Sequence, residues 1–294
     1  MSAVSGEVGS VSMPPAENPE LELVRGPSAL GGGRRRFFDL LWLISLNEFR
    51  KTFFGTALGY FWSLARPLML FGVLYVVFTK IIRFGNVPHY TVLLLFNIVL
   101  FSYFQEATGG GVGSVLAQEG IVRKTQFPRL VIPLSPAVLA LFTLGLNLVA
   151  VLFFLLVTGV DPMWTWLLFP LVLIPLMLLT AGVSMLLSAL NVRYRDVGVI
   201  WVVVAQALFY GSPIIYPIDL EGLPETLRTI LLINPLTPIL EQARHWVIDP
   251  NAPGAVSAAG GWLHMVPAIV VFIGVVVLGV WVFLREAPRI AERL

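Results

Sequence analysis

The chain has 294 residues, of which 57% are hydrophobic and 12% are charged. An average soluble domain has roughly a quarter of its residues charged, so this chain has too little polar surface to cover a water-facing globule. A soluble enzyme is excluded, and so is a disordered or collagen-like chain, because the apolar content is high and glycine follows no three-residue period. Continuous apolar runs predict an all-α polytopic membrane protein, since a transmembrane barrel shows short alternating segments.

The composition also limits the chemistry. Cysteine is absent and the three histidines, His89, His245 and His264, are far apart in the sequence, so we expect no disulfide and no metal site. The glycine-rich run at 108–114 lacks the lysine of a nucleotide-binding loop, and close helix packing is its simpler interpretation. Basic residues in a membrane protein are typical of cytoplasmic loops. We therefore expect no catalytic residue, no cofactor in this chain and no nucleic-acid partner.

The N-terminal region divides into two parts. Residues 1–36 are rich in small residues and proline and end in three arginines, which predicts a disordered cytoplasmic tail. Residues 37–54 predict an amphipathic helix lying in the membrane interface, with charges such as Arg50 and Lys51 off the apolar face. The apolar stripe of this helix consists of Phe38, Trp42, Leu46, Phe49 and Phe53. The alternative is that these residues form the cytoplasmic end of the first span.

Six segments of the remaining chain are long and apolar enough to cross a membrane, which takes about 20 residues. They lie near residues 58–79, 90–115, 131–157, 164–190, 197–215 and 265–284. Residues 37–294 thus form one transmembrane domain. A long external segment, residues 216–263, precedes the last span and contains two amphipathic stretches, 224–233 and 235–248.

The lysines and arginines of the loops predict the orientation. With the N-terminus inside, fourteen of them fall in cytoplasmic segments and four in external ones, so both termini are predicted to be cytoplasmic. The external four are Lys80, Arg83, Arg228 and Arg244. The cytoplasmic connection at 116–130 is polar and has two interpretations, a short helix that presses on a soluble partner or a solvated loop.

Several stretches, taken in order, resemble the permeases of type-2 ABC exporters. They are NEFRKTFFGTALGYFWSLARPL, IVRKTQFPRLVIPLS, LLSALNVRYRDV, FYGSPIIYP and INPLTPILEQAR. The resemblance covers residues 37–290 and is closest to the polysaccharide branch, whose members export O-antigen, teichoic acid or galactan chains on a lipid carrier. Arg66 departs from the family, in which the position before the proline is usually polar but uncharged.

The resemblance implies an inner-membrane permease that forms a homodimer and binds two copies of a separate ATPase subunit, which carries the ATP and magnesium. It also implies two surfaces that couple the permease to the ATPase. The first consists of Glu119, Arg123, Lys124 and Phe127, and the second of Arg193, Tyr194, Arg195 and Asp196. Short rigid helices at the cytoplasmic face can transmit ATPase closure as a rigid-body motion of the spans.

A path for a lipid-linked glycan needs aromatic faces and few charges. Two aromatic clusters are candidates to line it, Tyr60, Phe61 and Trp62 at the inner end and Phe209, Tyr210 and Tyr216 at the outer end. Packing, or a place in the aromatic belts of the membrane interfaces, is the alternative for each of these residues. Arg66 is costly in hydrocarbon, and contact with a carrier phosphate, snorkelling to the surface and pairing with Glu106 all remain open.

We therefore expect the transmembrane subunit of an exporter for a lipid-linked cell-envelope polysaccharide. An arginine-rich, alanine-rich composition is typical of GC-rich bacteria and favours an actinobacterial wall glycan such as galactan. Two alternatives are kept, an ABC exporter of a drug or small lipid and a membrane assembly or sensor protein that does not transport. An ATPase partner would separate the last of these from both exporters.

Overall fold

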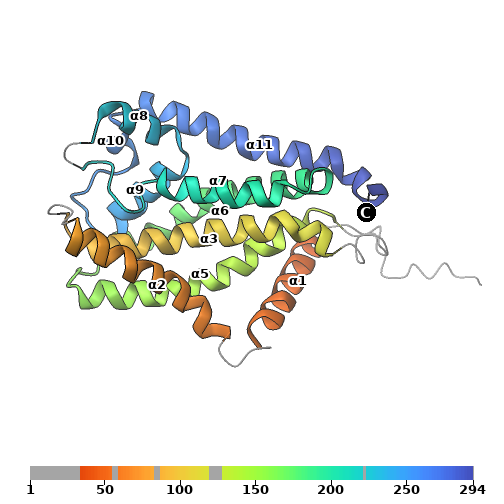
Figure 1. Ribbon diagram of the computed structural model, residues 1–294, viewed down its shortest axis with the longest axis horizontal. Coiled ribbons are helices and arrows are strands. Elements are labelled where there is room, and N and C mark those ends of the chain that lie inside the picture. The colour runs from red at the N-terminus through yellow and green to blue at the C-terminus, as the bar shows by residue number, and fades with distance from the viewer. Residues whose placement is uncertain (1–33, 55–58, 83–86, 119–127, 221–222, 294) are drawn as a thin grey trace, which may run out of the picture. The chain divides into compact units, whose positions relative to one another are not determined.

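The computed structural model describes residues 34–54, 59–82, 87–118, 128–220 and 223–293, which form one helical unit without strands in these ranges. Figure 1 shows the helices running largely side by side. Their bounds are α1 Arg34–Phe54, α2 Gly59–Val76, the π-helical turn η1 Val77–Ile81, α3 Tyr90–Ala117, α5 Val131–Val157, the 3₁₀ turn η2 Trp164–Leu168, α6 Phe169–Arg193, α7 Val197–Tyr210, α8 Glu225–Ile233, α9 Leu236–Val247, α10 Ala255–Ala259 and α11 Trp262–Arg293.

Five helices in the described part of the chain are long and apolar enough to cross a membrane. They are Phe61–Ile81, Tyr90–Ala117, Val131–Val157, Trp164–Arg193 and Trp262–Glu286. Each coincides with a predicted span, because an uninterrupted apolar run of this length is stable across hydrocarbon only as a helix. The multi-pass, all-helical class predicted from the composition is confirmed.

The predicted span at 197–215 differs from the other five. Its helix, α7, ends at Tyr210 after 14 residues, which is about 21 Å at the helical rise and shorter than the hydrocarbon core. Gly211 and Pro213 follow, and both disfavour continuation of a helix. Ser212, Ile214 and Ile215 are nevertheless buried, so the chain continues as a packed, non-helical segment.

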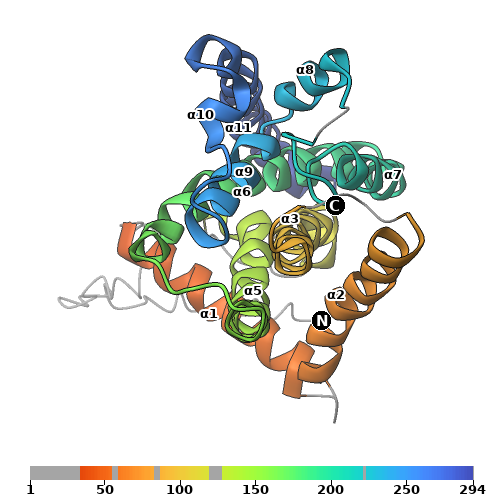
Figure 2. The same ribbon diagram turned by 90° about the vertical axis from the view of Figure 1, so that its left-hand side faces the viewer.

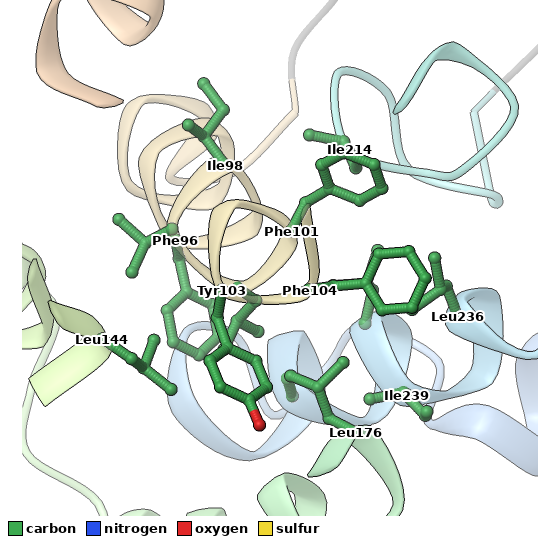
Figure 3. Close-up of a cluster of buried hydrophobic side chains, with 14 of the residues drawn as sticks. Phe96, Ile98, Phe101, Tyr103, Phe104, Leu144, Leu176, Ile214, Leu236 and Ile239 are labelled. Carbon is green, nitrogen blue, oxygen red and sulfur yellow. The ribbon is translucent and has the colours of Figure 1, made fainter. Parts of the chain in front are cut away.

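Helix α3 forms the centre of the bundle. It packs against α5, α6 and α2, and more lightly against α7 and α9; in the end view of Figure 2 its neighbours surround it. Figure 3 shows its aromatic side chains Phe96, Phe101, Tyr103 and Phe104 pointing outward in different directions into these neighbours. Helix α3 is the least apolar of the five candidate spans and the most buried of them. Polar side chains within a membrane face the interior of the bundle, and Asn97 and Thr108 of α3 find hydrogen-bond partners there.

Helices α6 and α11 approach each other closely at two glycines. A Cβ atom added at Gly279 of α11 would collide with the carbonyl oxygen of Gly182 of α6, and a Cβ added at Gly182 would lie 2.8 Å from the Cα of Val276. Small residues allow helices in a membrane to approach closely, where dispersion forces replace the hydrophobic effect as the source of association.

Helix α1 begins at Arg34, three residues before the predicted interfacial helix, and the remainder of the predicted tail, residues 1–33, lies outside the described residues. The helix packs along the first half of α5. Ser45 donates a hydrogen bond to the carbonyl oxygen of Ser135 over 3.2 Å, and the Trp42 ring meets the Phe142 ring edge-on at 5.3 Å. Its interfacial position in the membrane stays a prediction.

The two ends of the bundle differ in charge. We define the basic end as the end at which α3 finishes, α5 begins, α6 turns into α7 and α11 finishes, on the right of Figure 1. Arg129, Arg193, Arg195 and Arg285 lie there. The opposite end is formed by η2 and the short helices α8, α9 and α10. The amphipathic stretches predicted at 224–233 and 235–248 are confirmed as the helices α8 and α9.

Candidate functional site

An exposed charged turn connects α6 and α7 at the basic end. All four of its predicted coupling residues, Arg193, Tyr194, Arg195 and Asp196, are exposed. The guanidinium of Arg193 lies 5.1 Å from the centre of the Tyr194 ring, an arrangement that favours a cation stacked on an aromatic face. The turn thus exposes two cations, one carboxylate and an aromatic ring at the surface of the basic end.

This turn rests on a rigid base. Just before it, Asn191 donates from Nδ2 to the carbonyl oxygen of Val112 in α3 over 3.0 Å, and the hydroxyls of Ser188 and Ser114 are 3.4 Å apart. Just after it, Trp201 in α7 donates from Nε1 to the hydroxyl of Thr108 over 3.2 Å. Because hydrogen bonds on both sides hold the turn to α3, a force on it moves α3, α6 and α7 together.

The other predicted coupling residues, Glu119, Arg123, Lys124 and Phe127, lie outside the described residues. They directly follow the end of α3, which is the helix to which the charged turn is bonded. The first predicted coupling segment thus follows α3 in the sequence, and the second is hydrogen-bonded to α3.

Arg66 of α2 and Glu106 of α3 form no ion pair in the described structure. Arg66 is exposed and directly precedes Pro67 inside α2. No nitrogen–oxygen approach within ion-pair distance joins it to a carboxylate in the described structure. Glu106 instead accepts a hydrogen bond from the Thr143 hydroxyl of α5 over 3.4 Å. Arg66 thus retains donors for another ligand.

The six predicted aromatic residues are not equivalent. Phe61 and Trp62 are exposed, with ring centres 5.9 Å apart, and the Tyr60 side chain lies outside the described part. Tyr210 is exposed, and the Tyr216 hydroxyl donates to its carbonyl oxygen over 3.0 Å. Phe209, by contrast, is buried and packs edge-on against Phe101, so it belongs to the core of this protomer.

The five residues of the apolar stripe on α1 also differ in their exposure. Phe38 and Trp42 are exposed, Leu46 and Phe49 are half-buried and Phe53 is buried. Off the stripe, Lys51 pairs with Glu48 over 3.0 Å and Arg50 is exposed. An exposed apolar pair beside exposed charges is compatible with the interfacial position predicted for this helix.

Sequence reasoning missed a buried charge cluster at the opposite end. Glu241 and Arg244 of α9 are almost fully buried, and Arg244 contacts Glu241 at 3.3 Å and Asp219 at 2.7 Å. The backbone N–H of Ile218 donates to the Glu241 carboxyl over 3.0 Å. Burial raises the pKa of Glu241 to about 7, against the opposing effect of Arg244. The signal in the sequence is the three-residue spacing of opposite charges within an amphipathic helix.

This cluster fixes the external segment. It joins the non-helical stretch after α7 to α9, and Asn97 of α3 adds a hydrogen bond from Nδ2 to the carbonyl oxygen of Pro213 over 3.0 Å. In the described residues no group of three or more His, Asp or Glu side chains is placed to hold a metal ion. The cluster and Asn97 hold the backbone of residues 213–218 against α9 and α3.

These features define a class of protein, a polytopic helical membrane protein with a central buried helix and a charged turn fixed at one end. The model of the ABC-2 type transporter family matches residues 39–247. The chain belongs to this family, as its motifs predicted. It is therefore a transport component and a multi-pass protein of the inner membrane rather than an enzyme.

Curated relatives carry a common description, O-antigen export system permease protein RfbA. One from Klebsiella pneumoniae is 30% identical over 260 residues, 87% of this chain and 95% of that protein. A second from Klebsiella pneumoniae is 31% identical over 204 residues, 69% and 78% of the two chains. One from Myxococcus xanthus is 26% identical over 216 residues, 72% and 82% of the two chains.

Proposed function

We propose that this chain is the transmembrane subunit of an ABC exporter that moves a lipid-linked cell-envelope polysaccharide across the inner membrane. The observation that carries the proposal is its similarity to an O-antigen export permease over 95% of that protein's length. A drug or small-lipid exporter is the weaker alternative, because the relatives named above are described by polysaccharide export. Whether the glycan is an O-antigen, a teichoic acid or a galactan is decided by analysis of the accumulated product.

The energy source in this proposal is a separate ATPase subunit, bound in two copies by a homodimer of the chain. The charged turn at 193–196 supports this arrangement, since its four residues are exposed and its base is bonded to α3 on both sides. Residues 119–127 would add a second contact from the end of α3. Closure of the ATPase pair would then shift α3, α6 and α7 as one body.

The path for the glycan is proposed to pass the exposed faces of Phe61, Trp62 and Tyr210. Exposed aromatic faces can stack on sugar rings without using charge. Arg66 is proposed to meet the phosphate of the lipid carrier, because its planar guanidinium fits phosphate oxygens and it has no ion-pair partner in the described structure.

Depletion of the chain in its host tests the proposal. We expect the carrier-linked glycan to accumulate on the cytoplasmic side and export to return when the wild-type gene is supplied. A copy with its expression verified but with Arg195 reversed in charge serves as the matched control and should not restore export. Failure of any carrier-linked glycan to accumulate would refute polysaccharide export, and uptake of free hydrophobic compounds into inverted vesicles would favour the alternative.

Co-purification tests the partner. The tagged full-length chain should retain an ATPase subunit that carries a nucleotide-binding motif. If no such subunit binds, even weakly, the proposal of an ABC exporter powered in trans is wrong.

A further inference from the structure

An apolar groove lies between α6, α9 and α11 at the end of the bundle opposite the basic end. Its volume is about 280 Å³. Six of the residues that line it are Leu171 and Pro175 of α6, Ile239 and Trp246 of α9, and Ala268 and Phe272 of α11. The groove thus joins the external segment to two membrane-spanning helices.

The chemistry of the lining excludes a polar ligand. None of the lining residues is charged, and Gln242 carries the only amide side chain among them. Its Oε1 already accepts a hydrogen bond from the backbone N–H of Ala255 over 2.9 Å. A polar group that entered would lose its hydrogen bonds to water without replacement, at a cost of roughly 1–3 kcal/mol. The groove therefore accepts hydrocarbon.

The depth of the groove corresponds to the acyl chains of one leaflet. Trp262 and Trp164 are highly exposed at this end, as is typical of tryptophans at a membrane surface. Ala268 and Phe272 follow Trp262 along α11 by about 9 and about 15 Å. Half of the hydrocarbon core is about 15 Å thick, so the groove opens within the leaflet on this side.

The groove is also continuous with the lipid-facing surface. Leu171 and Ile269 both line it and are exposed. Beside them Ile174 of α6 and Val266 and Val270 of α11 are exposed apolar side chains. A lipid in the surrounding leaflet can therefore enter sideways without crossing a polar barrier.

The volume of the groove is too small for a helix but suits an acyl chain. A helix with its side chains is about 10–12 Å across, so this volume holds only about 3 Å of helix length. An apolar cavity of about 150 Å³ takes up one benzene molecule, and by that ratio the groove holds roughly eleven carbon atoms. That is a large part of one acyl chain and far too little for a helix of a second copy.

We propose that the groove is a binding site for one acyl chain of a membrane phospholipid from the leaflet at this end. The bound chain fills the space between α9 and α11 and holds the external segment against the spans. The site is independent of the proposed export function, because it uses none of the residues assigned to coupling or to the glycan path.

Photo-crosslinking tests the site directly. The full-length protein is reconstituted in phosphatidylethanolamine vesicles that contain a phosphatidylethanolamine with a diazirine in the middle of one acyl chain. After illumination, labelled peptides are mapped by mass spectrometry. We expect the label to concentrate on the lining segments of α6, α9 and α11. The variant Ala268→Phe fills the groove and should lower this labelling by about tenfold. A tenfold loss of affinity is what the loss of a small buried apolar contact produces.

Two further variants keep the test decisive. Ile269→Trp fills the mouth of the groove from a position that is already exposed, and it replaces Ala268→Phe if that protein does not fold. Val277→Phe adds the same side chain to the exposed face of α11 outside the groove and should leave the labelling unchanged. Labelling spread evenly over the lipid-facing helices, or unaffected by both filling variants, would overturn the proposal. Disulfide crosslinks between two copies of the variant Ile269→Cys, in a chain that otherwise has no cysteine, would also overturn it.

Discussion

Arg244 on α9 donates from Nη1 to the Oδ1 atom of Asp219, 2.7 Å away and 25 positions earlier in the chain. The guanidinium is almost completely buried, whereas the Asp219 side chain is about one third exposed. The pair therefore clamps the stretch that follows α7 onto α9. Breaking a buried pair by removing one partner costs more than the pair contributes, because the other charge is left without compensation.

The variant Arg244→Leu should lower the free energy of unfolding by about 3 kcal/mol at pH 8, since both Glu241 and Asp219 lose their cation. Thermal unfolding of the purified protein in detergent measures this change. Arg228→Leu is the matched control, because Arg228 is only partly buried and donates to one backbone carbonyl, that of Ala258. Equal melting temperatures for the two variants would contradict the clamp.

The stability of the external segment should depend on pH through Glu241. Its pKa is raised to about 7 in the folded protein, so between the ordinary value and 7 the folded state holds a proton that the unfolded state has released. Stability is then greatest below the ordinary pKa and falls as pH rises towards about 7, by on the order of 3 kcal/mol in total.

Melting temperatures recorded between pH 5 and 8 should show this fall in the wild-type protein. The variant Glu241→Gln keeps an oxygen that accepts the Ile218 N–H and removes the titration, so its melting temperature should change less over the same interval. If wild type and variant respond equally to pH, Glu241 is not the titrating group.

Replacing Gly279 by valine should separate α6 from α11. The added side chain would collide with the backbone of Gly182, and overpacking of this kind costs roughly 1–3 kcal/mol. Yield from membranes and melting temperature both report the loss. Gly274→Val on the same helix is the control, since a Cβ at Gly274 has no neighbour within 4 Å, and it should behave like the wild type.

Reversing the charge of Arg195 should weaken binding of the proposed ATPase subunit by about tenfold, the loss of one favourable charge contact. Co-purification at graded salt measures the affinity. Arg285→Glu, which changes the charge equally at the same end of the bundle, lies on α11 beside Trp281 and outside the charged turn. Comparable losses in both variants would point to a general charge effect instead.

The variant Arg66→Ala should reduce export strongly, and Arg66→Lys should restore only part of it, because lysine keeps the charge but not the planar fork that fits phosphate. Export is measured as the surface glycan of complemented cells. Membrane yield of all three proteins is compared in parallel. Unchanged export by the alanine variant would mean that Arg66 only reaches towards the membrane surface.

Local features of the fold followed from the sequence. The helix predicted at 131–157 is α5, and that predicted at 90–115 extends as α3 by two residues, because an apolar run of span length has one stable form in hydrocarbon. The family followed from motifs in a fixed order. The end of the helix at Tyr210 was not predicted, because the apolar residues continue to Ile215. Gly211 and Pro213 nevertheless end the helix.

Pairing between distant segments was decided only by the tertiary structure. Periodicity places Glu241 and Arg244 on one face of a helix, but it does not indicate that Asp219 closes the cluster. It shows Gly182 and Gly279 as isolated glycines, although together they set the distance between α6 and α11. The apolar groove likewise combines residues about a hundred positions apart. A sequence pattern records which side of an element is apolar, whereas the choice of partner depends on how whole helices fit against one another.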